Sequence, residues 1–505
     1  MTNSAVFLAV DLGASNGRLV AGRWNGVGFD VEELHRFPNV ALRQGKTLCW
    51  NVPSLWNGVL EGLRKLRAKD SSSPVGIGVD AWGVDFGLLD DGGNLMGNPV
   101  HYRDARTQGM LEYAATRIDD FRFFHSTGVQ PMAINTVYQL LSMIASGDRQ
   151  LCDAKTLLSI PDLFQYLLCG EKRAEYTEAT TTQLFDCAQR DWAWDLIETL
   201  QIRPSVFAPL CAPATILGPV QSSVLAECGF GDSFSAIAVA SHDTASAVAA
   251  IPDLDPESVF LSCGTWSLMG TPVETAIRSA EAFRLGFTNE GAADGGALCL
   301  KNLTGLWILQ ECIRCWQANG TQSAWSDLQQ AAAAATPFQT LIDTDAAEFQ
   351  SPSTMDDEIA AWCRQTGQVV PQRQAEITRC ILESLALTYR STLCDLARVT
   401  GRKFNVVRLV GGGSRNSLLC QMTADACNCV VVAGPVEAAA LGNLVAQAVS
   451  KRYLADFHEA SKVMAGTEQT RRYLPKDNDM WQEAARRLDT IREARAASQN
   501  AAPMV

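Results

Sequence analysis

The sequence predicts an α/β protein made of two similarly built domains, and three observations support that prediction. The chain has 505 residues, more than a single hydrophobic core normally organises. Short apolar runs alternate with helical patterns along its length. An apolar strand followed by a turn of small residues occurs at residues 6–15 and again at 259–267, half a chain later. The repeated match is short, so chance similarity is the alternative; if it is real, each domain begins with the same hairpin and both turns face a shared cleft.

In the first half of the chain we predict a series of strands and a helix that follows the last of them. Its opening apolar strand delivers one carboxylate, Asp11, into a turn of small residues, after which a second strand begins. Apolar runs predict strands at 75–79 and 86–89, and an Asp-Asp-Gly-Gly turn follows the second. A further short strand is expected at 236–240, with a helix over 245–250.

The second half follows the same alternation after a linker that contains Pro252 and Pro256. Pro371 precedes a long helical pattern that Gly401 ends. The polar stretch 343–357 is expected to be a surface excursion. The later elements follow in order: a strand at 406–410, a glycine turn at 411–413, a helix at 417–426 and a strand at 430–432.

These elements predict three parts of the chain. Residues 1–252 form an N-terminal domain, and residues 253–465 form a C-terminal domain. Residues 466–505 form a charged helix and a tail that frays from Ser498.

Composition narrows the possible partners and compartment. A net charge of −13 argues against nucleic acid or an anionic membrane as a partner. Apolar runs are too short for a membrane span, and no signal peptide is recognisable. Sixteen scattered cysteines indicate reduced thiols in the cytoplasm, and the Cys312–Cys315 pair lies in a helical pattern typical of buried thiols. We expect a cytoplasmic monomer or weak homodimer.

The turn after Asp11 is either an ordinary hairpin turn or a phosphate loop. Small residues let backbone N–H groups approach anionic oxygens, and the carboxylate can hold Mg²⁺ directly or through water. The turn is not a Walker A loop, because it lacks the Gly-Lys-Ser/Thr ending and leads into a strand. The similar turn at Gly264 and Thr265 favours a clasp on a triphosphate from both sides.

The segment Ser241-His242-Asp243-Thr244 lies where a strand ends and a helix begins. One interpretation is a simple helix cap. A hydrolase is disfavoured, because adjacent residues rarely point at each other and the chain has no G-x-S-x-G motif. The alternative is a lone carboxylate, Asp243, which the helix dipole keeps ionised and ready to accept a proton from an alcohol.

Two further motifs have both structural and functional interpretations. The three glycines at 411–413, between a strand and a helix, can contact a nucleotide or form a tight turn, but they do not fit a dinucleotide fingerprint. Trp82 in the stretch 80–85 can pack against a sugar or belong to the core. The dense polar group at 101–106 is unusual for a plain loop.

Together these stretches resemble the FGGY carbohydrate kinases, a branch of the actin-like ATPase superfamily, from about Val6 to Asn443. The resemblance rests on motifs in the expected order, including AVDLGAS, GVDAWGVDFGLLD, YRDARTQG, NTVYQL, ATTTQL, VASHDTASAV, SCGTWSLMG, KNLTGLWILQ, VGGGSRN and AGPVEAAALGN. It implies two duplicated actin-like, ribonuclease H-like α/β domains around a central catalytic cleft. It also raises a pairing of Cys363 with Cys380, which a reducing cytosol disfavours.

The resemblance implies a bacterial enzyme that transfers the ATP γ-phosphoryl group to the 1-hydroxyl of L-rhamnulose in L-rhamnose catabolism. It assigns Asp243 as general base and Asp11 as organiser of Mg²⁺ and the phosphates. The residues that it places on ATP are Ala14, Ser15, Asn16, Gly17, Arg18, Thr265, Gln310 and Gly412. Those that it places on the sugar are Gly83, His242, Asp243, Thr244 and Asn302.

Three alternatives stay open. The acceptor can be another ketose such as L-fuculose, L-ribulose or D-xylulose. The chain can be a catalytically dead sugar-binding regulator, although Asp11, Asp243 and both glycine loops are intact. It can also be an actin-like ATPase that turns over ATP without any sugar, whereas a kinase needs one.

Overall fold

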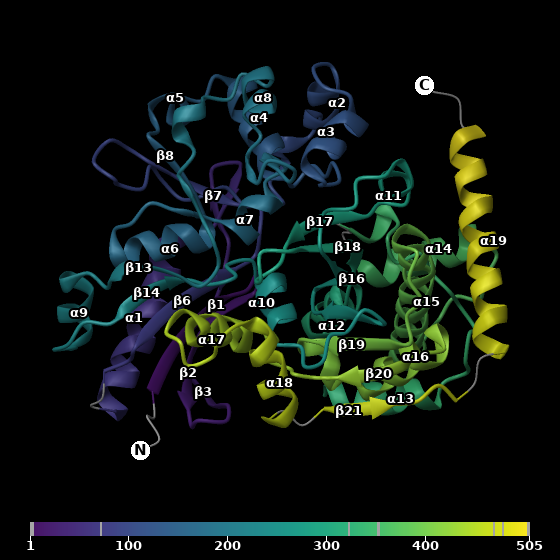
Figure 1. The fold of residues 1–505 in the computed structure, drawn as a ribbon. Coiled ribbons are helices and arrows are strands. Elements are labelled where there is room, and N and C mark those ends of the chain that lie inside the picture. Colours follow the sequence, from purple (N-terminus) through teal and green to yellow (C-terminus); the bar gives the residue numbers. More distant parts are fainter. Residues whose placement is uncertain are drawn as a thin grey trace. The chain divides into compact units, whose positions relative to one another are not determined.

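A computed structural model describes residues 5–70, 73–321, 324–350, 354–467, 470–476 and 479–501. The chain divides into two compact units (Figure 1). The first unit comprises Met1–Asp253, Pro272–Cys299 and Glu437–Glu468, and the second comprises Leu254–Thr271, Leu300–Val436 and Gln469–Val505. Each unit is therefore assembled from separate stretches of the chain.

The main sheet of the first unit has the strand order β13-β14-β6-β1-β2-β3. Its strands are β1 (Ala5–Leu12), β2 (Asn16–Trp24), β3 (Phe29–Pro38), β6 (Gly76–Ala81), β13 (Thr215–Pro219) and β14 (Ser235–Ala238). β1 pairs antiparallel with β2 and parallel with β6, and β6 pairs parallel with β14. The strands predicted at 75–79 and 236–240 are confirmed with small shifts in their ends.

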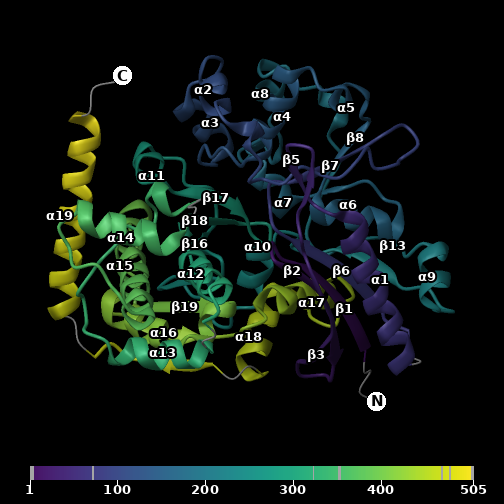
Figure 2. The ribbon, with the colours of Figure 1, turned by 180° about the vertical axis from the view of Figure 1, so that it is seen from behind.

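Both faces of this sheet are covered, which explains the continuous apolar run at the start of the chain. Leu8 and Val10 belong to the core that includes α1 (Val52–Lys69) and α6 (Ile160–Cys169), whereas Phe7 and Ala9 pack with α17 (Ala438–Ser450). Figures 1 and 2 show α17 beside β1, although the two lie far apart in the sequence. Because side chains alternate along a strand, Asp11 projects on the α17 face.

The second large sheet has the order β17-β18-β16-β15-β19-β20-β21; its strands from β18 to β21 repeat the arrangement of the first sheet, and β17 (Thr288–Gly291) is an additional edge strand. Its strands are β15 (Ser258–Cys263), β16 (Trp266–Val273), β18 (Ala297–Thr304), β19 (Val406–Val410), β20 (Val430–Ala433) and β21 (Arg471–Tyr473). β15 pairs antiparallel with β16 and parallel with β19, as β1 does with β2 and β6. The predicted duplication, with one hairpin at the start of each copy, is confirmed.

The remaining elements surround these sheets. In the first unit they are β4 (Leu42–Gln44), β5 (Thr47–Cys49), β7 (Phe86–Leu89), β8 (Thr156–Ser159), β9 (Ala174–Glu175), β10 (Phe185–Asp186), β11 (Asp191–Trp192), β12 (Leu210–Cys211), α2 (Met110–Ala115), α3 (Asp120–Thr127), α4 (Thr136–Ser146), α5 (Arg149–Asp153), α7 (Tyr176–Thr181), α8 (Trp194–Thr199), α9 (Ser222–Cys228), α10 (Asp243–Ala249), α11 (Ala280–Arg284) and α18 (Phe457–Thr467). In the second they are α12 (Trp307–Ala318), α13 (Trp325–Ala334), α14 (Met355–Gln365), α15 (Gln374–Thr400), α16 (Ser417–Cys427) and α19 (Asp479–Ala501). Short 3₁₀ turns lie at Ala105–Thr107, Pro204–Val206, Ala347–Phe349 and Gly412–Arg415.

Helix ends follow the expected local chemistry. Asn51 caps α1 by accepting a hydrogen bond from the Ser54 N–H, and Pro53 occupies the first turn, where no donor is needed. Gly401 ends α15 in the left-handed region, at a φ of 69°.

Two expectations need correction. The expected surface excursion at 343–357 is wrong for residues 343–350, because Thr344 and Phe349 are buried and Asp343 bonds Arg492 of α19 at 2.8 Å; residues 351–353 lie outside the described part of the chain. The tail predicted to fray from Ser498 is helical to Ala501 in α19, and residues 502–505 lie outside the described part of the chain.

The sixteen cysteines, all within the described residues, are free thiols, and Cys363 and Cys380 are both buried. Burial raises the pKa of the Cys380 thiol well above its usual range, so this group is a poor nucleophile. Among the described helices, none combines the length and apolar character that a membrane crossing requires.

Candidate active site

Asp11 is held by an arginine from the neighbouring strand. Arg18 donates from Nε at 3.0 Å and from Nη2 at 2.6 Å, and both bonds end on Oδ2 of Asp11. Nη1 of Arg18 forms a further ion pair with Glu437, the residue that precedes α17. Because both bonds use Oδ2, the other oxygen of Asp11 is not committed to the arginine. The arrangement pairs the carboxylate of Asp11 with a guanidinium beside the turn.

A second carboxylate, Asp80, lies directly beside Asp11. The two are register partners in the parallel pair β1–β6. Asp80 is fully buried, and its Oδ2 accepts a hydrogen bond of 2.7 Å from Nδ2 of Asn443 in α17. Burial, with the nearby charge of Asp11, raises the pKa of Asp80 well above its usual range. Asp80 therefore holds a proton more readily than an exposed aspartate does.

Asp80, Asn443 and Glu437 were not among the predicted site residues. A signal for Asp80 was present, because 6–11 and 75–80 both end in Val-Asp after apolar residues. Parallel neighbours bring such strand ends to the same edge of a sheet. Glu437 and Asn443 both lie in the motif AGPVEAAALGN, but nothing in that motif assigns them to the strand ends that carry Asp11 and Asp80.

The segment that carries Asp243 is anchored through its main chain. The Ser241 N–H donates to Oε2 of Glu175 at 3.0 Å, and the His242 N–H donates to Oγ1 of Thr177 at 3.1 Å. The Ala81 N–H donates to the Ser241 carbonyl at 2.9 Å, which ties the segment to the end of β6.

Glu175 supports this anchor from a fully buried position. Its Oε2 also accepts bonds from the Thr177 N–H at 3.0 Å, the Thr177 hydroxyl at 2.5 Å and the Glu178 N–H at 3.3 Å. Burial raises the pKa of Glu175 to about 7, although these bonds oppose the shift. Glu175 thus caps α7 and fixes residues 241–242 with the same oxygen.

Asp243 begins α10 with a side chain that is 35% exposed, unlike the buried residues around it. The Thr244 hydroxyl donates to Oδ1 at 3.2 Å. Withdrawal from water raises the pKa of Asp243, and His242 opposes that rise.

His242 corrects another expectation from the sequence. Its Nε2 lies 3.6 Å from Oδ1 of Asp243, so these adjacent residues do face each other. Its Nδ1 lies 3.2 Å from Oε2 of Glu290 in β17. Burial opposes the charge on His242, but Glu290 and Asp243 outweigh it and raise the pKa to about 9. His242 is therefore an imidazolium at neutral pH.

The first predicted phosphate loop is a tight hairpin turn. The Gly13 N–H donates to the Asn16 carbonyl at 2.9 Å, and Asn39 bonds the Gly13 carbonyl at 2.9 Å. Ser15 at the tip is exposed, and Ala14, Asn16 and Arg18 are half-buried. A Cβ on Gly17 would lie 2.4 Å from the Phe37 ring, so only glycine fits that position. The exposed tip leaves its backbone accessible to a phosphate.

Gly83 lies in a constrained bend after β6. A Cβ placed on it would approach the Thr181 side chain to 3.0 Å, and the next residue, Val84, has a φ of 72°. That conformation is strained for a β-branched residue. It is held because Thr181 accepts a bond from the Val84 N–H at 3.1 Å and Thr136 donates to the Val84 carbonyl at 2.6 Å. Such strain is common where backbone meets a ligand.

Trp82, for which the sequence left open a sugar contact or a place in the core, is buried in the core. Its ring packs 4.1 Å from that of Trp50, and both indole N–H groups donate to Oδ2 of Asp85, at 3.1 and 2.6 Å. Within the polar group at 101–106, His101 stacks on Trp50 at 3.9 Å. Burial lowers the pKa of His101 to about 4, so it is neutral. Trp50, Trp82 and His101 therefore pack against one another, and the two tryptophans bond the buried Asp85.

In the second unit, the structure brings Thr265 and Gln310 into contact. The Thr265 hydroxyl donates to Oε1 of Gln310 at 3.2 Å, and the Trp307 N–H that begins α12 donates to the Thr265 carbonyl at 3.2 Å. A Cβ on Gly305 would lie 2.5 Å from the Trp266 carbonyl carbon, which forces glycine there. Asn302 lies in β18, half-buried.

The glycine turn packs against the end of β15. Hypothetical Cβ atoms on Gly411 and Gly413 would meet Cys263 at 3.0 and 2.3 Å, whereas one on Gly412 would meet nothing within 4 Å. Gly411 also has a φ of 79°. Of the three, Gly412 alone has an open side that a flat ligand can approach.

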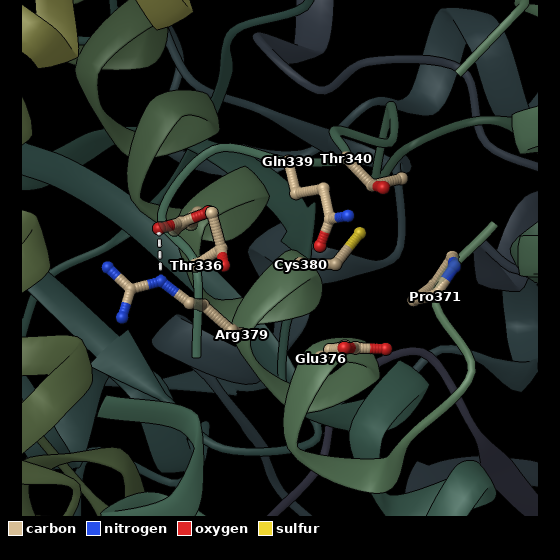
Figure 3. Close-up of a pocket in the computed structure, with 8 residues that line it drawn as sticks. Thr336, Gln339, Thr340, Pro371, Glu376, Arg379 and Cys380 are labelled. Atoms are coloured by element: carbon tan, nitrogen blue, oxygen red, sulfur yellow. Dashed lines mark hydrogen bonds and ion pairs between the residues drawn. The ribbon is translucent and has the colours of Figure 1, made fainter. Parts of the chain in front are cut away.

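A small cavity in the second unit includes none of the predicted site residues (Figure 3). It has about 10 Å³ of space, enough for one water molecule, beside Cys380 and the ion pair between Arg379 and Glu383. We assign it no role in the chemistry.

The described residues contain no group of three or more His, Cys, Asp or Glu side chains placed to hold a metal ion. Mg²⁺ usually takes one or two carboxylates and completes its shell with water and substrate phosphates. Asp11, with one oxygen not used by Arg18, fits such a role.

Two family models match the first and second halves of the chain. The N-terminal domain model of the FGGY family of carbohydrate kinases matches residues 6–250, and the C-terminal domain model matches residues 259–451. A rhamnulokinase of Bacteroides thetaiotaomicron is 38% identical over 478 residues, which is 95% of this chain and 97% of the relative. A rhamnulokinase of Klebsiella pneumoniae is 38% identical over 473 residues, covering 93% and 94%.

Solved structures extend the likeness in fold. A ligand-bound xylulose kinase from Lactobacillus acidophilus superposes with a TM-score of 0.81 at 15% identity, over 98% of this chain and 99% of that chain. A Plasmodium falciparum glycerol kinase with ADP gives a TM-score of 0.76 at 14% identity, over 99% of both chains. The predicted pair of actin-like α/β domains is confirmed.

Proposed function

Because the chain belongs to the FGGY family of carbohydrate kinases, we propose that it phosphorylates the 1-hydroxyl of L-rhamnulose with ATP. The sugar kinase class follows from the family. The particular ketose is supported by relatives named rhamnulokinase that are 36% to 38% identical over nearly the whole chain. L-fuculose, L-ribulose and D-xylulose are the competing acceptors.

The observation that carries the mechanism is the setting of Asp243. Its carboxylate is one-third exposed, while the segment before it is buried and bonded through its main chain to Glu175 and Thr177. A carboxylate whose pKa is raised by withdrawal from water is a better proton acceptor than a fully solvated one. We therefore assign Asp243 as the general base.

In this mechanism the carboxylate of Asp243 accepts the proton of the sugar 1-hydroxyl. The oxygen forms a bond to the γ-phosphorus as the bond from that phosphorus to the β,γ-bridging oxygen breaks, which yields the sugar 1-phosphate and ADP. Gly83, His242, Thr244 and Asn302 are assigned to hold the sugar. The strained bend at Gly83 and Val84 supports close approach of the backbone to that ligand.

The phosphates are assigned to the hairpin turns and the glycine turn. The exposed tip at Ala14, Ser15 and Asn16, with Gly17 and Arg18, supplies N–H groups and positive charge. Thr265, Gln310 and the open side of Gly412 supply the remaining nucleotide contacts. When bound at Asp11, Mg²⁺ neutralises phosphate charge.

The decisive experiment measures ADP release over a panel of ketoses and polyols, with Asp243→Asn beside the parent enzyme. We expect strong dependence on L-rhamnulose and a fall in kcat of about 10²–10⁴-fold in the variant, with ATP binding kept. Full activity of the variant removes Asp243 from its role. A much larger kcat/KM for another ketose changes the substrate, and ADP release without sugar indicates an ATPase.

The location and assembly proposed from the sequence are a cytoplasmic monomer or weak homodimer. The sixteen free thiols support a reducing compartment. Sedimentation at micromolar concentration tests the assembly.

A further inference from the structure

Three side chains form a row in the first unit, with an imidazole between two carboxylates. Nδ1 of His242 lies 3.2 Å from Oε2 of Glu290, and Nε2 lies 3.6 Å from Oδ1 of Asp243. The side chains of His242 and Glu290 are 8% and 9% exposed, compared with 35% for Asp243. The row therefore leads from a buried glutamate to the accessible carboxylate assigned as the base.

Glu290 is fixed by the backbone on both sides. The Asn289 N–H donates to the Gly128 carbonyl at 2.9 Å, and the Gly291 N–H donates to the Thr180 hydroxyl at 2.8 Å. A Cβ on Gly291 would lie 2.7 Å from the ring of Tyr176, so β17 packs closely on α7. The carboxylate of Glu290 is thus presented to His242 from a strand that has little freedom to move.

The imidazole of His242 and the carboxylate of Glu290 are each other's nearest polar partner on this side of the ring. Among the described residues, Nδ1 of His242 and Oε2 of Glu290 are both buried without a hydrogen-bond partner, and they lie 3.2 Å from each other. A buried polar group without a partner costs about 1–3 kcal/mol, and more when it is charged. This cost favours a state in which His242 carries a proton on Nδ1, directed at Oε2 of Glu290.

The surrounding charges make His242 the cation beside the base. The titratable groups that face His242 are Glu290, Asp243 and Glu175; those that face Asp243 also include Asp11 on β1. Glu178 on α7 and Asp80 on β6 are buried acids whose pKa values burial raises well above their usual range. Arg18 is engaged by Asp11 and Glu437.

We propose that Glu290 is a positioning residue that keeps His242 doubly protonated, so that its Nε2–H faces and orients the carboxylate of Asp243. This inference rests on the proposed function, in which Asp243 accepts the sugar proton. If His242 were neutral, Glu290 would favour the tautomer with the proton on Nδ1. The lone pair of Nε2 would then face the carboxylate of Asp243 and repel it. Glu290 therefore acts on the transfer step through His242, without touching the substrate.

The test compares Glu290→Gln, which keeps the shape and removes the charge, with the parent enzyme. Histidine labelled with ¹⁵N reports the titration of all five histidines, and His242→Asn identifies the signal of interest. We expect the parent signal to titrate near pH 9 and the variant signal to titrate about one unit lower or more. The measurement needs neither sugar nor ATP.

Kinetics supply the second readout. At a pH above the His242 titration midpoint of Glu290→Gln, we expect kcat of the variant to be about tenfold or more below that of the parent. As the pH is lowered through this midpoint, kcat should recover toward the parent value. KM for ATP should not change. A purely structural defect lowers kcat equally at every pH. An unchanged His242 midpoint, or a loss that does not vary with pH, overturns the proposal.

Two controls separate the possible failures. If Asp243→Asn is inactive while Glu290→Gln matches the parent in both readouts, only this inference fails; if Asp243→Asn is active, the assigned base is wrong. Should Glu290→Gln not fold, Glu290→Asp keeps the charge on a shorter side chain. Its His242 midpoint should then fall below that of the parent, and an unchanged midpoint again overturns the proposal.

Discussion

The main-chain N–H of Ser241 donates a 3.0 Å hydrogen bond to Oε2 of Glu175. The same oxygen accepts the hydroxyl of Thr177, and that hydroxyl in turn accepts the His242 N–H at 3.1 Å. A buried carboxylate thus fixes two successive peptide units immediately before Asp243. The position of the assigned base is set by its backbone as well as by its neighbours.

Thr177→Val removes the hydroxyl of this relay at nearly constant volume. The His242 N–H then loses its acceptor and Glu175 loses a donor, so we expect kcat to fall about tenfold and the free energy of unfolding to fall by about 1–3 kcal/mol. Steady-state kinetics and thermal unfolding measure the two effects.

Thr177→Ser, which retains the hydroxyl, should keep most of the activity. Thr199→Val is a matched control, because the Thr199 hydroxyl bonds a carbonyl within its own exposed helix. Equal kcat values for Thr177→Val and the parent enzyme would show that the relay does not position Asp243.

Asp80→Asn should make the protein more tolerant of high pH. Burial and the charge of Asp11 raise the pKa of Asp80 in the folded state. Between the pKa of Asp80 in the unfolded chain, about 3.9, and its higher pKa in the folded protein, only the folded state binds the proton. The free energy of unfolding therefore falls as the pH rises through this window and levels off above the folded-state pKa. Asparagine lacks this titration, and its amide oxygen can still accept the bond from Asn443.

We therefore expect the Tm of Asp80→Asn to exceed that of the parent by a margin that grows between about pH 5 and pH 8. Differential scanning calorimetry across this range measures it. Asp90→Asn, at an exposed turn, should show no such widening. A margin that is constant with pH would mean that Asp80 is ionised in the folded protein.

The free thiols give a prediction about covalent structure. Because Cys363 and Cys380 are both unpaired and buried, alkylation after denaturation without reductant should modify all sixteen cysteines. Intact-mass spectrometry counts the added groups, and reductant should leave the Tm unchanged. A mass two groups short would indicate a disulfide in the purified protein.

The duplicated hairpins could be predicted because their signal is local. Strand β19 has the bounds that its apolar run indicates, and Asp243 lies at the strand–helix junction that its neighbours suggest. The same local evidence could not settle Trp82, whose core environment depends on Trp50 from another segment. An aromatic residue beside glycine is compatible with both a ligand and a core.

The missing site residues come from segments that return to the first unit from later in the chain. Asn443 and Glu290 belong to the stretches Glu437–Glu468 and Pro272–Cys299, which pack with residues 1–253. The motif that contains Asn443 contributes to the family resemblance, but the local sequence around these two residues does not indicate that they pack with residues 1–253. Side chains from distant segments also decide the charge state of His242 and Asp80, so no motif reveals it.

Two glycines in the second unit should respond in opposite ways to the same substitution. A Cβ on Gly305 would lie 2.7 Å from the carbonyl oxygens of Gly264 and Thr265, and backbone cannot move aside cheaply. We expect Gly305→Ala to lower the free energy of unfolding by about 1–3 kcal/mol, as overpacking does. Chemical denaturation measures this loss, and a stability equal to that of the parent would mean that the turn can shift to admit a methyl group.

Gly412→Ala is the matched substitution at the assigned nucleotide contact. Nothing lies within 4 Å of its hypothetical Cβ, so we expect the free energy of unfolding to change by no more than about 0.5 kcal/mol. The methyl group would nevertheless occupy the open side where a ligand approaches the backbone. KM for ATP should therefore rise severalfold while KM for the sugar stays the same, because a methyl group at this position excludes the nucleotide without disturbing the first unit. Steady-state kinetics with each substrate varied in turn measure both constants, and an unchanged KM for ATP would remove Gly412 from the nucleotide site.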